Sequence, residues 1–134
     1  MMSEIVAPSV AIRPVPVDDA MLHTRVLVAE LDGQVVGHGL VRLIRSRKRR
    51  IGRIGLHADE RFGDRGVSRA LLERLLQLAD RQRLDCLEVE VLANNAPAIQ
   101  LYESAGFVTE RTDQDRQALV MVRARQPWGL GLFG

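Results

Sequence analysis

The segment GDRGVSRALLERLLQLAD, residues 63–80, joins a glycine-bearing turn to an amphipathic helix. The first turn of a helix has unpaired backbone N–H groups and about half a positive charge, so it can hold an anion. Gly66 lets a ligand approach the backbone closely, and Arg65, Ser68 and Arg69 add donors that suit a diphosphate better than a carboxylate. An ordinary loop followed by a surface helix fits the same residues, so this segment alone leaves both interpretations open.

A second group of reactive side chains is expected on the strand Leu84–Leu92. Because successive side chains of a strand point to opposite faces, Glu88 and Glu90 share one face, together with Cys86. The other face carries the apolar Leu87, Val89 and Val91. Two carboxylates on one face of a central strand indicate that this face borders water or substrate.

The elements that must position these groups follow from hydrophobic periodicity and turn residues. Strand patterns occupy Val10–Pro14, Thr24–Glu30, Gln34–Arg45 and Arg50–His57, and Asp32-Gly33 favours a tight hairpin between the second and third of them. Apolar residues at helical spacing from Val67 to Leu78 then predict a helix. The remaining segments are predicted as a strand, a helix that Gly106 ends, and two strands: Leu84–Leu92, Ala96–Ser104, Phe107–Arg111 and Ala118–Arg125.

Length and composition predict one compact domain, and the order of strands and helices makes it α/β. The chain has 134 residues, of which 46% are hydrophobic, and this suits a single domain over residues 1–126 with an apolar, glycine-rich tail over 127–134. The net charge of +2 does not demand a nucleic-acid partner. The single cysteine, Cys86, fits a reducing compartment, and no segment is typical of a signal peptide or a membrane span. We therefore expect a cytoplasmic protein that does not enter a membrane.

The segment LEVEVLANNAPAIQLYESAGF, residues 87–107, carries a motif. It contains N-x-x-A-x-x-L-Y-x-x-x-G-F, on Asn95, Ala98, Leu101, Tyr102, Gly106 and Phe107. With the glycine turn and the strand order, the region from residue 24 to 125 resembles the GNAT superfamily of acetyl-coenzyme A dependent N-acetyltransferases. The motif segment is most similar to ribosomal-protein alanine acetyltransferases. The resemblance implies a mixed, mostly antiparallel sheet flanked by helices, and acetyl-CoA as cosubstrate without a metal.

The family's diphosphate loop, R/Q-x-x-G-x-G/A, falls on Gly63, Asp64, Arg65, Gly66, Val67 and Ser68, and Arg69 follows it. Gly63 replaces the usual Arg or Gln, and Ser68 replaces the second Gly or Ala. Asp64 adds a negative charge that must point outward or pair with Arg61 or Arg65. We still expect coenzyme binding, because backbone N–H groups supply most of such a loop's contacts.

The family's reaction, direct attack of an amine on the thioester, implies roles for several residues. Neutralising an alkylammonium at pH 7 costs roughly 4–5 kcal/mol, so a base is expected. The resemblance points to Glu90 as that base, with His57 as an alternative at the end of its strand. Tyr102 matches the family's general acid, with stabilisation of the thiolate by a hydrogen bond as its safer role. Asn95 is expected to bond the coenzyme or to cap its helix.

The oxyanion would be held by a backbone N–H group near the end of the strand Arg50–His57. Leu56 and Ala58 are the two candidates for this contact. Each of the three side chains also has a structural alternative. Tyr102 could simply pack its ring in the core, and Glu90 and His57 could simply face solvent.

Only about nine residues separate the first strand from Thr24, whereas the family places two helices there. The first two helices are therefore expected to be largely missing. This leaves either an open groove, which suits a protein N-terminus or an exposed lysine, or a gap that another segment fills; a small amine is the other acceptor class. The candidate fillers, within one chain or across a homodimer, are the apolar residues of the tail, Trp128, Leu130, Leu132 and Phe133. A protein that binds acyl-CoA with little turnover, as a sensor or interaction partner, is the alternative function.

The run RSRKRR, Arg45 to Arg50, raises the question of an RNA or acidic partner. No aromatic residues lie between the arginines as base-stacking platforms would, so a charged hairpin tip is the favoured interpretation and a nucleic-acid role is not expected.

Overall fold

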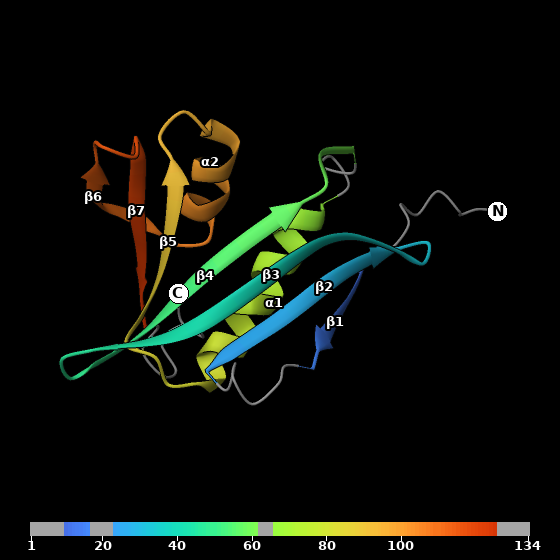
Figure 1. Cartoon of the computed structure of the whole chain (residues 1–134), viewed down its shortest axis with the longest axis horizontal. Coiled ribbons are helices and arrows are strands. Elements are labelled where there is room, and N and C mark those ends of the chain that lie inside the picture. The colour runs from blue at the N-terminus through green and yellow to red at the C-terminus, as the bar shows by residue number, and fades with distance from the viewer. Residues whose placement is uncertain (1–9, 17–22, 62–65, 126–134) are drawn as a thin grey trace. The chain divides into compact units, whose positions relative to one another are not determined.

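The computed structural model describes residues 10–16, 23–61 and 66–125. They form seven strands and two helices, in the hydrogen-bonded strand order β1-β2-β3-β4-β5-β7-β6 (Figure 1). The elements are β1 Ala11–Val15, β2 Thr24–Leu31, β3 Gln34–Ser46, β4 Arg49–Ala58, α1 Val67–Arg81, β5 Cys86–Leu92, α2 Ala96–Ser104, β6 Val108–Asp113 and β7 Ala118–Ala124. The predicted α/β class with a mixed, mostly antiparallel sheet is confirmed.

The chain divides into two compact units, which are described separately. The first comprises residues 1–42 and 55–77, and the second comprises residues 43–54 and 78–134. In the first unit, β1 pairs antiparallel with β2, and β2 pairs antiparallel with β3. Asp32 and Gly33 join β2 to β3 with φ values of 51° and 81°, so both residues of the predicted tight turn have the positive φ that it requires.

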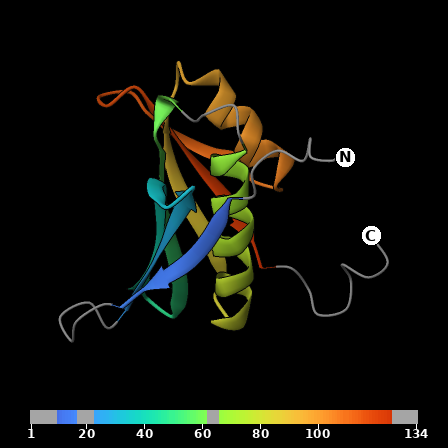
Figure 2. The same cartoon turned by 90° about the vertical axis from the view of Figure 1, so that its right-hand side faces the viewer.

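Helix α1 packs along one face of the strands in the first unit (Figure 2). Val67, Leu71 and Leu75 are fully buried on this side of the helix. Gly37 allows the close approach, because a Cβ atom there would lie 2.9 Å from a methyl group of Val67 and 2.9 Å from the carbonyl oxygen of His57. The predicted helical spacing of apolar residues is thus the packing face of α1.

In the second unit, β5 is a central strand with a neighbour on each side. It pairs parallel with β4 through Ile51–Cys86, Gly52–Leu87 and Arg53–Glu88, and antiparallel with β7 along its whole length. β6 pairs antiparallel with β7 at the end of the strand order. Helix α2, orange in Figure 1, follows β5 and buries Tyr102. The core of this unit includes the predicted apolar face of β5.

Element boundaries differ from the predicted ones at a few ends. β5 begins at Cys86 rather than at residue 84, and β6 runs from Val108 to Asp113 rather than from 107 to 111. α2 has the predicted bounds, residues 96–104. Between β1 and β2 the described residues include no helix, and residues 17–22 and the tail from residue 126 lie outside the described part. No helix among the described residues is long and apolar enough to span a membrane.

Candidate active site

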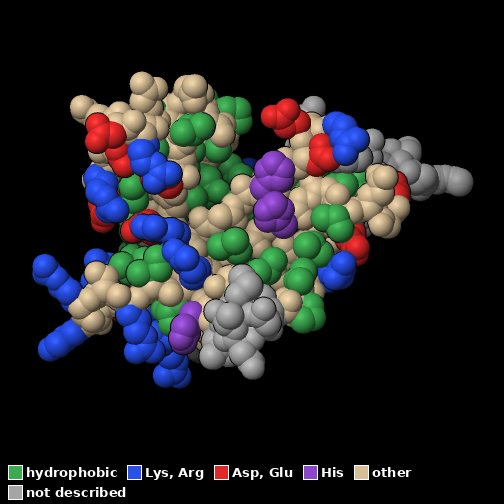
Figure 3. Space-filling view, viewed as in Figure 1, with side chains coloured by type: hydrophobic (Ala, Val, Ile, Leu, Met, Phe, Trp, Pro, Cys, Tyr) green, Lys and Arg blue, Asp and Glu red, His purple; other side chains and the backbone are tan. Residues whose placement is uncertain are grey.

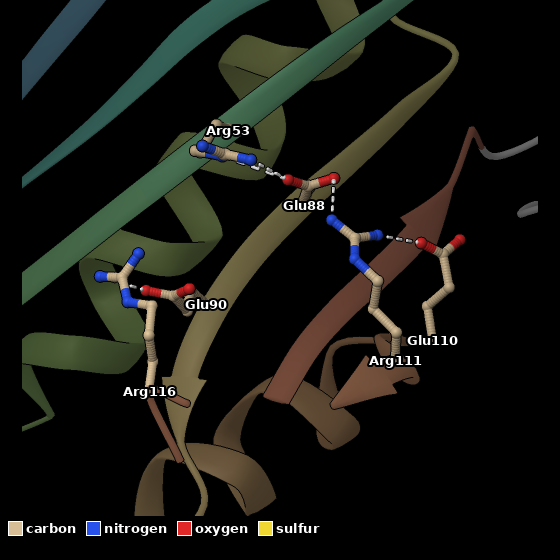
Figure 4. A network of polar contacts seen from close by, with 6 residues as sticks. All are labelled: Arg53, Glu88, Glu90, Glu110, Arg111 and Arg116. Carbon is tan, nitrogen blue, oxygen red and sulfur yellow. Dashed lines mark hydrogen bonds and ion pairs between the residues drawn. The ribbon is translucent and has the colours of Figure 1, made fainter. Parts of the chain in front are cut away.

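Glu88 is buried on β5 and lies between two arginines (Figure 4). Arg53 of β4 donates to its Oε1 atom through Nε at 3.1 Å and through Nη2. Arg111 of β6 places Nη2 3.9 Å from Oε2 and donates through Nη1 to Glu110 at 2.6 Å. A buried carboxylate is costly unless it is paired, and these two guanidinium groups compensate its charge.

Glu90 lies two residues further along the same face of β5 and is exposed to solvent. Its Oε1 atom contacts Nη2 of Arg116 at 2.9 Å, and Figure 4 shows this guanidinium beside the carboxylate. No described residue donates a hydrogen bond to Oε2 of Glu90. The predicted shared face of Glu88 and Glu90 is confirmed, but arginines cover the Glu88 end of it.

Both glutamates line a concavity of about 740 Å³ in the second unit. Its other walls are Arg53, the segment from Arg111 to Arg116, and Val120. A cavity of this volume is large enough for a small-molecule substrate. The side chain predicted to act as the base therefore opens into a space that an acceptor amine can enter.

Tyr102 of α2 is 4% exposed and packs its ring edge-on against Phe107, with the ring centroids 5.4 Å apart. Burial raises the pKa of the Tyr102 phenol to about 12. The structural alternative predicted for Tyr102, an aromatic ring packed in the core, is therefore observed. Donation of the proton to a thiolate whose ordinary pKa is about 8.5 would be uphill by roughly 5 kcal/mol, so a hydrogen bond without full transfer is the favoured chemistry.

Asn95 caps α2, because its Oδ1 atom accepts a hydrogen bond from the backbone N–H group of Ala98 at 3.2 Å. Gly106 ends the helix with φ +94°, and the N–H group of Phe107 bonds the Tyr102 carbonyl at 3.0 Å. The capping role left open for Asn95 is therefore observed. A contact between Asn95 and a coenzyme stays a prediction.

The first turn of α1 begins at Gly66, which has φ +77°. The first intrahelical bond runs from the N–H group of Ala70 to the Gly66 carbonyl at 3.0 Å, so the N–H groups of Val67, Ser68 and Arg69 precede it. Gly63, Asp64 and Arg65 of the predicted diphosphate loop lie outside the described residues. Arg61, one predicted partner of Asp64, forms an ion pair with Asp59, with Nη2 2.7 Å from Oδ2.

The end of β4 carries the other predicted contacts, Leu56, His57 and Ala58. The His57 side chain is exposed and its ring lies 5.3 Å from the ring of His38, and Figure 3 shows two histidine side chains touching on the surface. The solvent-facing alternative for His57 is therefore observed. Leu56 and Ala58 stay predictions as oxyanion contacts.

Beyond this strand end, hydrogen bonds from Arg61 hold the pKa of Asp59 down at about 2. The run from Arg45 to Arg50 forms the tip of the β3–β4 hairpin, where basic side chains gather in Figure 3. No group of three or more His, Cys, Asp or Glu side chains among the described residues could hold a metal ion.

The arginines that compensate the two glutamates were not singled out from the sequence. Arg53 lies 35 residues before Glu88, and only the parallel register of β4 with β5 brings them together. Arg116 lies in the turn between β6 and β7. The one usable signal was the pair of carboxylates on a strand, because a carboxylate facing the interior requires a cation nearby.

The model of the acetyltransferase (GNAT) family matches residues 4–107. An L-amino acid N-acetyltransferase of Escherichia coli is 39% identical over 88 residues, which cover 64% of this chain and 54% of that protein. The crystal structure of a ribosomal-protein-alanine N-acetyltransferase from Brucella melitensis is 28% identical, with a TM-score of 0.69 over 75% of this chain and 68% of that one.

A putative acetyltransferase from Salmonella typhimurium, solved with its cofactor acetyl-CoA, shares the fold at 23% identity, with a TM-score of 0.72 over 82% of this chain and 69% of that one. The chain spans about half the length of the Escherichia coli relative.

Proposed function

Because this chain belongs to the acetyltransferase (GNAT) family, we propose that it transfers an acetyl group from acetyl-CoA to a primary amine by direct attack. The observation that supports the proposal is the start of α1, where Gly66 has φ +77° and the next three N–H groups have no hydrogen-bond acceptor among the described residues, as the predicted anion site requires. The resemblance of residues 87–107 to the family, which led to the same activity, supports it independently.

The first turn of α1 fits a diphosphate. A Cβ atom added at Gly66 would meet nothing within 4 Å, so a ligand can approach the backbone there. The N–H groups of Val67, Ser68 and Arg69 and the positive end of the helix would hold the two phosphates. The bound coenzyme supplies an activated acetyl carbonyl, and the protein's residues position the amine and move protons.

Glu90 would accept the proton of the incoming ammonium group. Glu90 lines the concavity, and no described residue donates a hydrogen bond to its Oε2 atom. Tyr102 would donate a hydrogen bond toward the departing sulfur while keeping its proton, as its pKa of about 12 favours. Leu56 or Ala58 would provide a backbone N–H group for the oxyanion, a contact worth about 3–4 kcal/mol in the transition state.

The names of the relatives suggest two acceptor classes, an L-amino acid and an alanine of a ribosomal protein. Both are α-amines, so the chemistry asked of Glu90 is the same. We propose an α-amine acceptor on this ground.

Two observations favour the alternative of an acyl-CoA binding protein with little turnover. An arginine holds the proposed base, and burial makes the proposed acid a poor proton donor. Such a protein would still bind the thioester at α1 but would release thiol slowly. Binding and turnover must therefore be measured separately.

The test combines calorimetric titration of acetyl-CoA with spectrophotometric release of free thiol in the presence of L-amino acids and peptides with free N-termini. We expect saturable binding and thiol release that depends on the amine. Binding without release with every amine would favour the sensor, and absence of binding would refute both functions.

Glu90→Gln isolates the base. We expect kcat to fall by about 100-fold or more, since general bases contribute on that scale. Glu73→Gln is the matched control, because Glu73 is exposed on α1 and does not line the concavity. Equal activity of the two variants would remove Glu90 from the mechanism.

A further inference from the structure

We infer that the concavity on the Glu90 face of β5 binds the acceptor as a zwitterion, an α-amino acid whose carboxylate is free, rather than as a peptide N-terminus. The inference rests on the proposed acetyl transfer and names the acceptor class of that same site. It is argued from the charges that line the concavity and from the atoms left without partners.

The lining of the concavity is almost entirely polar. Of its ten lining residues only Val120 has an apolar side chain, and the others carry charges, an amide or a hydroxyl group. Small-molecule sites are usually lined mostly by apolar groups. A polar space of about 740 Å³ therefore suits a small, charged ligand better than an apolar side chain or an acyl chain.

Positive and negative side chains are mixed along the lining, so the concavity does not carry charges of a single sign. Three arginines and four carboxylates line the space, so their formal sum is −1. A polyamine would be favoured by carboxylates alone, and a dianion by arginines alone. A ligand that carries both an ammonium and a carboxylate group matches a wall in which the two signs lie side by side.

Two arginines keep donors available for a carboxylate. Arg53 uses Nε and Nη2 on Glu88, and its Nη1 donates no hydrogen bond to the described residues. Arg116 places Nη2 on Glu90, and its Nε and Nη1 donate no hydrogen bond to the same part of the chain. Glu88 is itself buried and paired, so it fixes the Arg53 guanidinium instead of competing for the ligand.

Several carboxylates of this wall can accept a hydrogen bond from the ammonium end. Among them, Glu90 is the proposed base, and no described residue donates a hydrogen bond to its Oε2 atom. A zwitterion held by Arg116 through its carboxylate would therefore present its amine to the group that must deprotonate it. A peptide N-terminus has no carboxylate at this position, so the remaining donors of Arg116 would gain no charged partner from it.

The test compares matched acceptors by thiol release. L-alanine, L-methionine, L-glutamate and L-lysine are each assayed beside the corresponding α-amide, which keeps the amine and removes the carboxylate charge. We expect kcat/KM for at least one free acid to exceed that of its amide by about tenfold to a hundredfold, the scale of a charged hydrogen bond. Amides that react as well as or better than all four acids would overturn the inference.

Arg116→Gln tests the assigned side chain. It should lower kcat/KM for the free acid more than kcat/KM for its amide, so that the preference for the free acid is lost. Arg81→Gln is the matched control, since Arg81 is exposed at the end of α1 and does not line the concavity. A preference for the acid that survives in Arg116→Gln would overturn the assignment.

Direct binding separates this inference from the proposed function. Each free acid and its amide is titrated calorimetrically into the protein saturated with coenzyme A, a measurement that needs no turnover. Binding of the acid but not of the amide supports the zwitterion site even if no amine releases thiol, in which case only the proposed acetyl transfer fails. No binding of any acid under these conditions would overturn the inference, even if peptides release thiol.

Discussion

Tyr102 should titrate near pH 12, well above an ordinary tyrosine, because its phenol is 4% exposed and burial disfavours the phenolate. The perturbation is a rise in pH from 9 to 12 under native conditions. Tyr102 is the only tyrosine of the chain, so every phenolate absorbance change reports on this one group. The same shift predicts how stability depends on pH.

The magnitude follows from the pKa difference between the folded and unfolded states. A rise from 10.0 to about 12 is two units, and one unit corresponds to about 1.4 kcal/mol, so about 3 kcal/mol of stability is linked to the protonated phenol. The unfolded chain releases this proton near pH 10, while the folded chain keeps it to about 12. This contribution is therefore complete below pH 10 and is lost as the pH rises to 12.

The assay is an ultraviolet titration of native protein, run in parallel with urea unfolding at pH 9, 10 and 11. Few other groups interfere, since Lys48 is the only lysine and Cys86 the only cysteine, and arginine keeps its proton. Burial also raises the pKa of the Cys86 thiol, so Cys86→Ala serves as the background in which to compare Tyr102 with Tyr102→Phe. Tyr102→Phe should flatten the decline in stability over this range.

A phenolate that forms near pH 10 while far-ultraviolet circular dichroism still reports folded protein would refute the reasoning. If the free energy of unfolding declines equally from pH 9 to 11 with and without Tyr102→Phe, the pH-dependent stability is not linked to Tyr102. Either result would also reopen the role of Tyr102 as a proton donor, because its weakness as an acid rests on the same burial.

Gly37→Ala should destabilise the protein by about 1–3 kcal/mol, the range for overpacking, because the new Cβ atom would lie 2.9 Å from the carbonyl oxygen of His57. Gly55→Ala is its control, since the nearest atom to a Cβ there is at 3.5 Å, and equal urea midpoints for the two variants would contradict the packing argument. Glu88→Gln should cost about 1–2 kcal/mol, less than for a fully buried pair because Arg53 is half exposed. Urea unfolding measures this loss of free energy, and a variant as stable as the parent would show that the Glu88–Arg53 ion pair does not stabilise the fold.

Local chemistry explains why several elements were predictable from the sequence. Asp32-Gly33 specifies a tight turn because few residue pairs tolerate positive φ at both positions, and both values are positive. Helix α2 has its predicted bounds because Asn95 caps its first turn and Gly106 accepts the left-handed conformation at its end. Each of these signals lies within a few residues of the element that it controls.

The site was predictable only in part. The shared face of Glu88 and Glu90 follows from the alternation of a strand. The anion site at Gly66 stays a prediction, although the glycine turn before α1 on which it rests is observed. The roles of Glu90 and Tyr102 came from the family resemblance, and they stay predictions until the variants are measured. The departures at Gly63 and Asp64 lie outside the described residues.

The sequence by itself determined which residues form the strands, which face of β5 is charged, where α1 and α2 begin and the family to which the chain belongs. Only the tertiary structure decided that Arg53 and Arg111 neutralise Glu88, that Arg116 holds one oxygen of Glu90, and that Tyr102 is too deeply buried to give up its proton readily. The physical reason is that strand register and burial are set by contacts between residues far apart in the chain, whereas turns, caps and periodicity are set by neighbours.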